Sequence, residues 1–113
     1  MNTRSAKQKG KRLQNLLRDA LLSSFPELEP EDIKVALSSE TGEDIKLSPA
    51  ARRLIPFSFE CKNQQKAKIW EWIKQAESNA NGYTPAVVFS RNREISYVTL
   101  SLVDFIKIIA PKP

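Results

Sequence analysis

Apolar residues in this chain switch between helical spacing and strict alternation, and this switching limits what each segment can fold into. Near the start they recur every three or four residues, which predicts an amphipathic helix that ends at Phe25-Pro26. From residue 33 the pattern alternates, as is typical of strands. The expected strands are Ile33–Leu37, Gly42–Ser48 and Leu54–Lys62, with a turn at residues 38–42 and a basic loop at residues 48–53.

The second half of the chain repeats this change of spacing. Helical spacing returns over Lys66–Ala80, and Asn81-Gly82 ends that helix. Ala86–Phe89 and Tyr97–Leu100 predict two more strands, the first covered on both faces. Capping boxes at Ser5-Gln8 and Ser101-Asp104 predict the starts of the first and last helices. The order is therefore helix, three strands, helix, two strands, helix, which predicts an α/β (α+β) fold with a mixed central sheet and helices on both faces.

The length favours one domain. With 113 residues, 41% of them hydrophobic, the chain can bury one ordinary core and is short for two. It has neither an internal repeat nor a low-complexity linker. We therefore expect a single domain over residues 1–113, with residues 1–12 as a basic N-terminal segment.

Positive charge gathers at the start of the chain. The formal net charge is +5, from 18 basic and 13 acidic residues. Residues 1–12 contain no acid and five bases, which are Arg4, Lys7, Lys9, Lys11 and Arg12. A helix N-terminus prefers anions, so a bound phosphate would explain these bases better than helix stability does. The segment favours a polyanionic partner, and the alternative is a solvated, poorly ordered basic end.

Several chemistries are excluded by composition. A single cysteine, Cys61, excludes an internal disulfide, and the absence of histidine excludes Cys/His zinc sites and every histidine-based nucleophile or general base. A catalyst here must use carboxylates and lysine, with or without a metal ion. No apolar run approaches the ~18 residues of a membrane helix, and the N-terminus lacks a signal peptide's apolar stretch. We expect a soluble protein in a reducing cytoplasm, without a membrane or small-molecule cofactor.

One run, Phe57 to Gln64, places an acid and a base inside an apolar strand. Glu60 and Lys62 lie two residues apart, so they share one face of the strand at a spacing of about 6.5 Å, whereas Cys61 faces the core. If the preceding strand pairs with this one, Asp44 lies beside Glu60. Two neighbouring carboxylates repel each other, and a divalent cation such as Mg²⁺ would relieve the repulsion and support phosphodiester hydrolysis. The alternative is an ordinary ion pair on an exposed face.

These motifs resemble a known nuclease core. Gly42-Glu43-Asp44-Ile45, followed by Glu60-Cys61-Lys62, is similar to the G-x-D...E-x-K pattern of the PD-(D/E)xK nuclease superfamily, especially small phage-type nucleases and archaeal Holliday junction resolvases. The opening "KGKRLQNLLRDAL" resembles the first helix of those proteins, and the order of elements resembles their restriction-endonuclease-like core. Glu43 stands where the superfamily often has proline.

The resemblance implies roles for individual residues. Asp44, Glu60 and the backbone carbonyl of Cys61 would bind Mg²⁺, for which Mn²⁺ would substitute, and Lys62 would be the catalytic lysine. Gln14 stands where the resolvase branch commonly has a glutamate, so a second metal site is in doubt. Gln75 resembles an accessory glutamine of some relatives, and a solvated helix face is the alternative.

The resulting hypothesis is a Mg²⁺-dependent endodeoxyribonuclease, acting on duplex or branched DNA as a resolvase-like homodimer in a bacterial or phage-infected host cell. Trp70 lies off the apolar stripe of its helix and favours a dimer interface over a base contact. The alternatives are a homing or restriction-type enzyme with sequence preference, and a non-catalytic DNA-binding module. The expected phosphate contacts are Arg4, Lys7, Lys9, Lys11, Arg12, Arg52 and Arg53, with Arg91 and Arg93 as weaker candidates.

Overall fold

The computed structural model describes residues 3–38 and 40–112, with side chains in the first helix described from Lys7 onward. Its elements are α1 (Thr3–Ser24), the 3-10 turn η1 (Pro30–Asp32), β1 (Ile33–Val35), β2 (Ile45–Leu47), α2 (Pro49–Leu54), β3 (Phe57–Asn63), α3 (Ile69–Ser78), β4 (Thr84–Ser90), β5 (Tyr97–Thr99) and α4 (Leu102–Ile109). The predicted order of the main helices and strands is confirmed, and α2 and η1 are additions to it.

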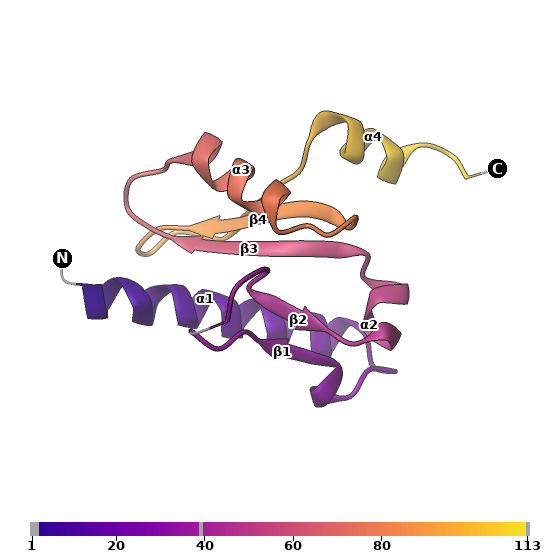
Figure 1. Ribbon diagram of the computed structural model, residues 1–113, viewed down its shortest axis with the longest axis horizontal. Coiled ribbons are helices and arrows are strands. Elements are labelled where there is room, and N and C mark those ends of the chain that lie inside the picture. Colours follow the sequence, from indigo (N-terminus) through magenta and orange to yellow (C-terminus); the bar gives the residue numbers. More distant parts are fainter. Residues whose placement is uncertain (1–2, 39, 113) are drawn as a thin grey trace.

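The strands form a mixed three-stranded sheet and a separate antiparallel pair (Figure 1). In the larger sheet, β4 runs parallel to β3, with Phe57 opposite Thr84 and Asn63 opposite Ser90, and antiparallel to β5. The pair consists of β1 and β2, with Ile33 opposite Leu47. Asp44 is expected beside Glu60 if the strand at residues 42–48 pairs with the strand at residues 54–62. β2 and β3 belong to different sheets, and a backbone hydrogen bond from the Asp44 N–H to the Phe59 carbonyl joins the start of one to the other.

Helices cover both faces of the larger sheet, as the spacing of apolar residues predicts (Figure 1). On one face, Leu13 of α1 packs in a core with Phe59 and Cys61 of β3. On the other face, Trp72 of α3 packs with Val87 of β4. The middle of β4 is buried on both faces, which agrees with its uninterrupted apolar sequence. β3 is thus fixed from both sides, and its polar residues are held in place by that packing.

Two local predictions are wrong. Residues 48–53 are not a loop, because Ser48 caps α2 by accepting a hydrogen bond from the Ala51 backbone N–H at 3.1 Å and Pro49 occupies a first-turn position, where proline is favourable. The capping box at Ser5 does not start α1 either, since the helix already includes Thr3.

Candidate active site

Glu60 and Lys62 lie on the face of β3 that points toward α3, as the alternation of the strand predicts. Their side chains form an ion pair, with 3.4 Å between Lys62 Nζ and Glu60 Oε2. The Glu60 side chain is only 3% exposed and that of Lys62 is 20% exposed. An exposed-face ion pair is therefore the wrong description of these residues. A carboxylate this deeply buried needs more compensation than one lysine gives.

Asp44 is attached to the edge of β3 by two hydrogen bonds. Its backbone N–H donates to the Phe59 carbonyl at 2.9 Å, and its Oδ2 accepts from the Cys61 backbone N–H at 2.7 Å. In a strand, the N–H and C=O of one residue point toward the same edge. The Cys61 carbonyl thus points toward the edge of β3 at which Asp44 lies.

Burial and mutual repulsion perturb both carboxylates. Burial raises the pKa of Asp44, and this rise is opposed by the Cys61 hydrogen bond, the charge of Lys62 and a hydrogen bond from the Gln14 side chain. Burial also raises the pKa of Glu60, the negative charge of Asp44 raises it further, and Lys62 opposes both effects. The two carboxylates therefore lie close enough to repel each other, and positive charge at this point would favour their ionised forms.

The donor set fits a hard divalent cation. Glu60 Oε1 is buried and has no hydrogen-bond partner, although a buried acceptor normally has one. Residues 3–38 and 40–112 contain no cluster of three or more Cys, Asp and Glu side chains suited to a metal. Two carboxylates and one carbonyl suit Mg²⁺, which keeps several water ligands and completes its shell with substrate phosphates. Asp44, Glu60 and the Cys61 carbonyl could hold such an ion.

A cleft lies beside Asp44. It has a volume of about 570 Å³ and lies between the first half of α1 and the segment that follows β1. Gln14 and Asp44 line it together with Lys7 and Lys11. Lys11 Nζ donates to the Ala36 carbonyl at 3.1 Å, so this lysine also ties the two walls together. The cleft is therefore basic on the α1 side and acidic on the opposite side, at Asp44 and Glu40.

A second cleft lies on the other side of α1. Its volume is about 320 Å³, and Arg12 of α1 lines it together with Arg91 and Arg93 from the turn between β4 and β5. Asn63 at the end of β3 also lines it and donates from Nδ2 to the Lys9 carbonyl at 3.3 Å. Arginines far apart in the sequence are thus gathered in one cleft. The side chain of Arg4 lies outside the described residues.

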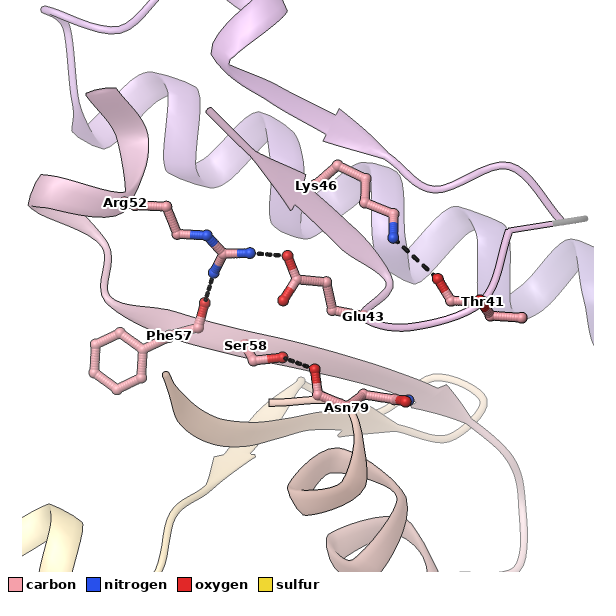
Figure 2. Close-up of polar contacts among 7 residues, drawn as sticks. All are labelled: Thr41, Glu43, Lys46, Arg52, Phe57, Ser58 and Asn79. Carbon is pink, nitrogen blue, oxygen red and sulfur yellow. Dashed lines mark hydrogen bonds and ion pairs between the residues drawn. The ribbon is translucent and has the colours of Figure 1, made fainter. Parts of the chain in front are cut away.

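Arg52 does not lie in either cleft, contrary to its expected role as a DNA contact. Figure 2 shows its guanidinium bound to the Glu43 carboxylate and to the Phe57 carbonyl, the second contact at 2.8 Å. The guanidinium also stacks over the Tyr83 ring, 4.1 Å from its centre. Arg52 is thus occupied in holding α2, β3 and the residue before Asp44 together, whereas the neighbouring Arg53 is exposed.

Sequence reasoning missed the roles of three residues near the site. Glu43 is buried and anchors the Asp44 segment through Arg52, and Lys46 Nζ supports the same turn by donating to the Thr41 carbonyl at 3.1 Å (Figure 2). Asn79, at the end of α3, lowers the pKa of Glu60 through a side-chain hydrogen bond. The only sequence signal for Asn79 was its position one helical turn after Gln75, which is itself exposed.

Comparison with known proteins decides the family. Residues 5–112 match the family described as "Phage putative PDDEXK endonuclease". The chain belongs to this family. The match covers nearly the whole chain, so the recognition of a PD-(D/E)xK nuclease of the phage type is confirmed, and so is a fold compatible with a restriction-endonuclease-like core. No curated protein and no solved structure matches this PDDEXK endonuclease chain. None of the helices in the described part of the chain is long and apolar enough to cross a membrane.

Proposed function

We propose that this PDDEXK endonuclease chain is a metal-dependent endodeoxyribonuclease that hydrolyses phosphodiester bonds at Asp44, Glu60 and Lys62. The observation that carries the proposal is the buried Glu60 Oε1, which lacks a hydrogen-bond partner and lies beside a second carboxylate and a lysine. A structural ion pair has no need of a second carboxylate, because that charge raises the cost of burying the first. A cation-binding site needs both.

Mg²⁺, or Mn²⁺ in its place, would be held by Asp44, Glu60 and the Cys61 carbonyl, and would supply Lewis-acid stabilisation of the charge that develops on the phosphate. The Cys61 N–H fixes the Asp44 carboxylate, so little reorganisation is needed during the reaction. Lys62 Nζ, held beside Glu60, donates hydrogen bonds to the attacking water or to a phosphate oxygen. Gln14 orients the Asp44 carboxylate from the α1 side through its side-chain hydrogen bond, without adding charge.

DNA would reach the site along the first half of α1. The two clefts on either side of this helix gather Lys7, Lys11, Arg12, Arg91 and Arg93, which suit a phosphate backbone on both sides of the helix. Phosphate contacts position DNA without reading its sequence. We therefore favour recognition of DNA shape, as in a junction resolvase. The protein would act in the cytoplasm of the host cell.

The test is incubation with a labelled four-way junction and a matched linear duplex, with and without Mg²⁺. Wild-type protein should cleave only with Mg²⁺, and symmetric nicking of the junction alone would identify a resolvase. Asp44→Asn, Glu60→Gln and Lys62→Ala should each slow cleavage by at least about 100-fold, because each removes a group that stabilises developing charge. DNA binding should remain largely intact.

The matched controls are Glu71→Gln and Lys74→Ala, which make the same kinds of change at exposed positions of α3 and should cleave like the wild type. Full activity in all three active-site variants would refute the proposed site. Metal-independent binding without cleavage of any duplex, flap or junction would indicate a non-catalytic DNA-binding module instead.

A further inference from the structure

An aromatic pocket lies at the end of the larger sheet, on the face that carries Lys62. Its volume is about 310 Å³, at the lower end of the range for small-ligand sites. One wall is aromatic and the other is polar. The aromatic wall comes from Trp72, Phe89 and Tyr97, and the polar wall from Gln64, Gln65, Arg91 and Glu94. None of these residues belongs to the proposed metal site, so the pocket needs an explanation of its own.

The three aromatic rings form a continuous stack from the core to the surface. The ring centres of Trp72 and Phe89 lie 6.1 Å apart, and those of Phe89 and Tyr97 lie 6.0 Å apart with 29° between the ring planes. Trp72 is buried, whereas Tyr97 is 54% exposed and Ile95, which also lines the pocket, is 68% exposed. The inner rings pack α3 against the sheet, but the outer ring presents an exposed aromatic surface to the pocket. Such a surface suits a further flat ring.

The stack begins beside the proposed catalytic lysine. Phe89 is the register partner of Lys62 in the β3–β4 ladder, and Tyr97 is the partner of Phe89 in the β4–β5 ladder. Directly opposed residues of neighbouring strands point to the same face, so these three side chains form one row. At a strand spacing of about 4.8 Å, the backbone of Tyr97 lies about 10 Å from that of Lys62. A group bound on Tyr97 is therefore close to the phosphate that Lys62 would serve.

Hydrogen bonds hold the polar wall in place. The Gln64 N–H donates to the Ser90 carbonyl at 3.2 Å, and Gln65 Oε1 accepts from the Asn92 N–H at 3.3 Å. Ser90 Oγ donates to the Glu94 carbonyl at 3.1 Å and so closes the turn between β4 and β5. The segment after β3 is thus joined to this turn. The pocket is formed before any ligand arrives, which lowers the cost of binding.

The aromatic pocket is continuous with the second cleft but differs from it in charge. Ser90, Arg91 and Glu94 line both. In the pocket, the Arg91 and Glu94 side chains lie 3.8 Å apart and are the two charged groups of the lining, so their charges balance. The second cleft adds Arg12 and Arg93 and is therefore positive. An uncharged flat ring suits the pocket, and a phosphate joined to that ring suits the cleft. A nucleotide has both parts.

We propose that this pocket binds one unpaired nucleobase of the DNA substrate, next to the phosphate to be cleaved. The inference rests on the proposed nuclease function and names its substrate class, which is DNA with an unpaired nucleotide at the cleavage site, such as a flap or a branch point. A base inside a duplex has both faces covered by its neighbours, so only an unpaired or extruded base offers a ring face to Tyr97. Aromatic stacking beside a basic groove is how proteins bind single-stranded nucleic acid. The Gln64 and Gln65 amides offer donors and acceptors to the edge of the base.

The experiment measures binding of the full chain to two labelled DNAs by fluorescence anisotropy in EDTA, so that no cleavage is required. One DNA is a duplex with a bulge of three thymine nucleotides, and the other has abasic nucleotides in the same bulge, so both carry the same phosphates. Wild-type protein should bind the thymine bulge at least about fivefold more tightly, which is the lower end of the gain from stacking one base. Tyr97→Ala should lose this preference, and Tyr97→Phe should keep it because the ring remains. Phe105→Ala is the matched control, since it removes an aromatic ring that is 47% exposed on α4 and lies outside the pocket.

The comparison of the two bulges also works without any variant. If Tyr97→Ala fails to fold, the ratio of the two affinities in the wild type still decides the proposal. Equal affinity of the wild type for the thymine and abasic bulges would overturn it, as would a preference that folded Tyr97→Ala retains. Cleavage in Mg²⁺ by a protein without the preference would refute the base pocket alone. A preference for the thymine bulge without cleavage of any DNA would refute the nuclease alone.

Discussion

Replacing Arg52 by methionine tests whether the Glu43–Arg52 pair holds the active-site segment. The pair is well buried, with side chains 10% and 15% exposed. Arg52→Met keeps most of the side-chain volume but leaves the Glu43 carboxylate without its cation and the Phe57 carbonyl without this donor. Breaking one partner of a buried pair costs about 3–5 kcal/mol, and the residual exposure of both side chains favours the lower end. We expect a loss of about 3 kcal/mol.

Urea unfolding followed by circular dichroism measures this loss. With a urea dependence of about 1.5 kcal/mol per molar, 3 kcal/mol lowers the midpoint by about 2 M without changing the slope. Adding Glu43→Gln to Arg52→Met should restore most of the stability, since the uncompensated charge is then gone. Arg53→Met is the matched control, and at its exposed position it should change stability by less than about 0.5 kcal/mol.

The same variants separate a structural role of Arg52 from a role in DNA binding. Folded Arg52→Met protein should bind DNA as tightly as wild type, because its guanidinium is already committed to Glu43 and Phe57. Equal stability of Arg52→Met and wild type, or a failure of Glu43→Gln to compensate, would refute the reasoning about this pair.

Three further predictions concern the site and its DNA path. The pKa of Glu60 is raised in the folded state, mainly by burial, so Glu60 favours folding at low pH and this contribution is lost as the pH rises through its folded pKa. Glu60→Gln should therefore be more stable than wild type at neutral pH but not in acid, and Mg²⁺ should stabilise only the wild type. Urea unfolding across a range of pH measures both effects. Equal stability–pH profiles for the variant and the wild type would contradict this reasoning. Asn79→Ala removes a hydrogen bond that lowers the pKa of Glu60, so the acidic limb of the pH–rate profile should move to higher pH, whereas Gln75→Ala should leave it in place. Arg93→Met should weaken DNA binding and lower the slope of log affinity against log salt concentration by about one phosphate contact. Lys34→Met, at an exposed position of β1, should change neither the affinity nor the slope. An unchanged slope for Arg93→Met would remove the second cleft from the DNA path.

Local sequence patterns determined the order of elements and the faces of their residues. The alternation around Glu60 predicted that it shares a face with Lys62 while Cys61 enters the core, because side chains of a strand point to opposite faces in turn. Helical spacing likewise placed Trp72 in the core and Trp70 outside it. These features depend on neighbours within a few residues, which a single sequence contains in full.

Only the tertiary structure decided which distant groups meet. The sequence predicted Arg52 as a DNA contact, where the structure binds it to Glu43, and it did not place Asn79 beside Glu60 or Arg12 beside Arg93. It also left open how β2 meets β3, and in the structure a backbone hydrogen bond to Phe59 positions Asp44. The physical reason is that a charged side chain binds whichever partner the packed core brings within about 4 Å, and that partner depends on how the layers of the whole fold pack together.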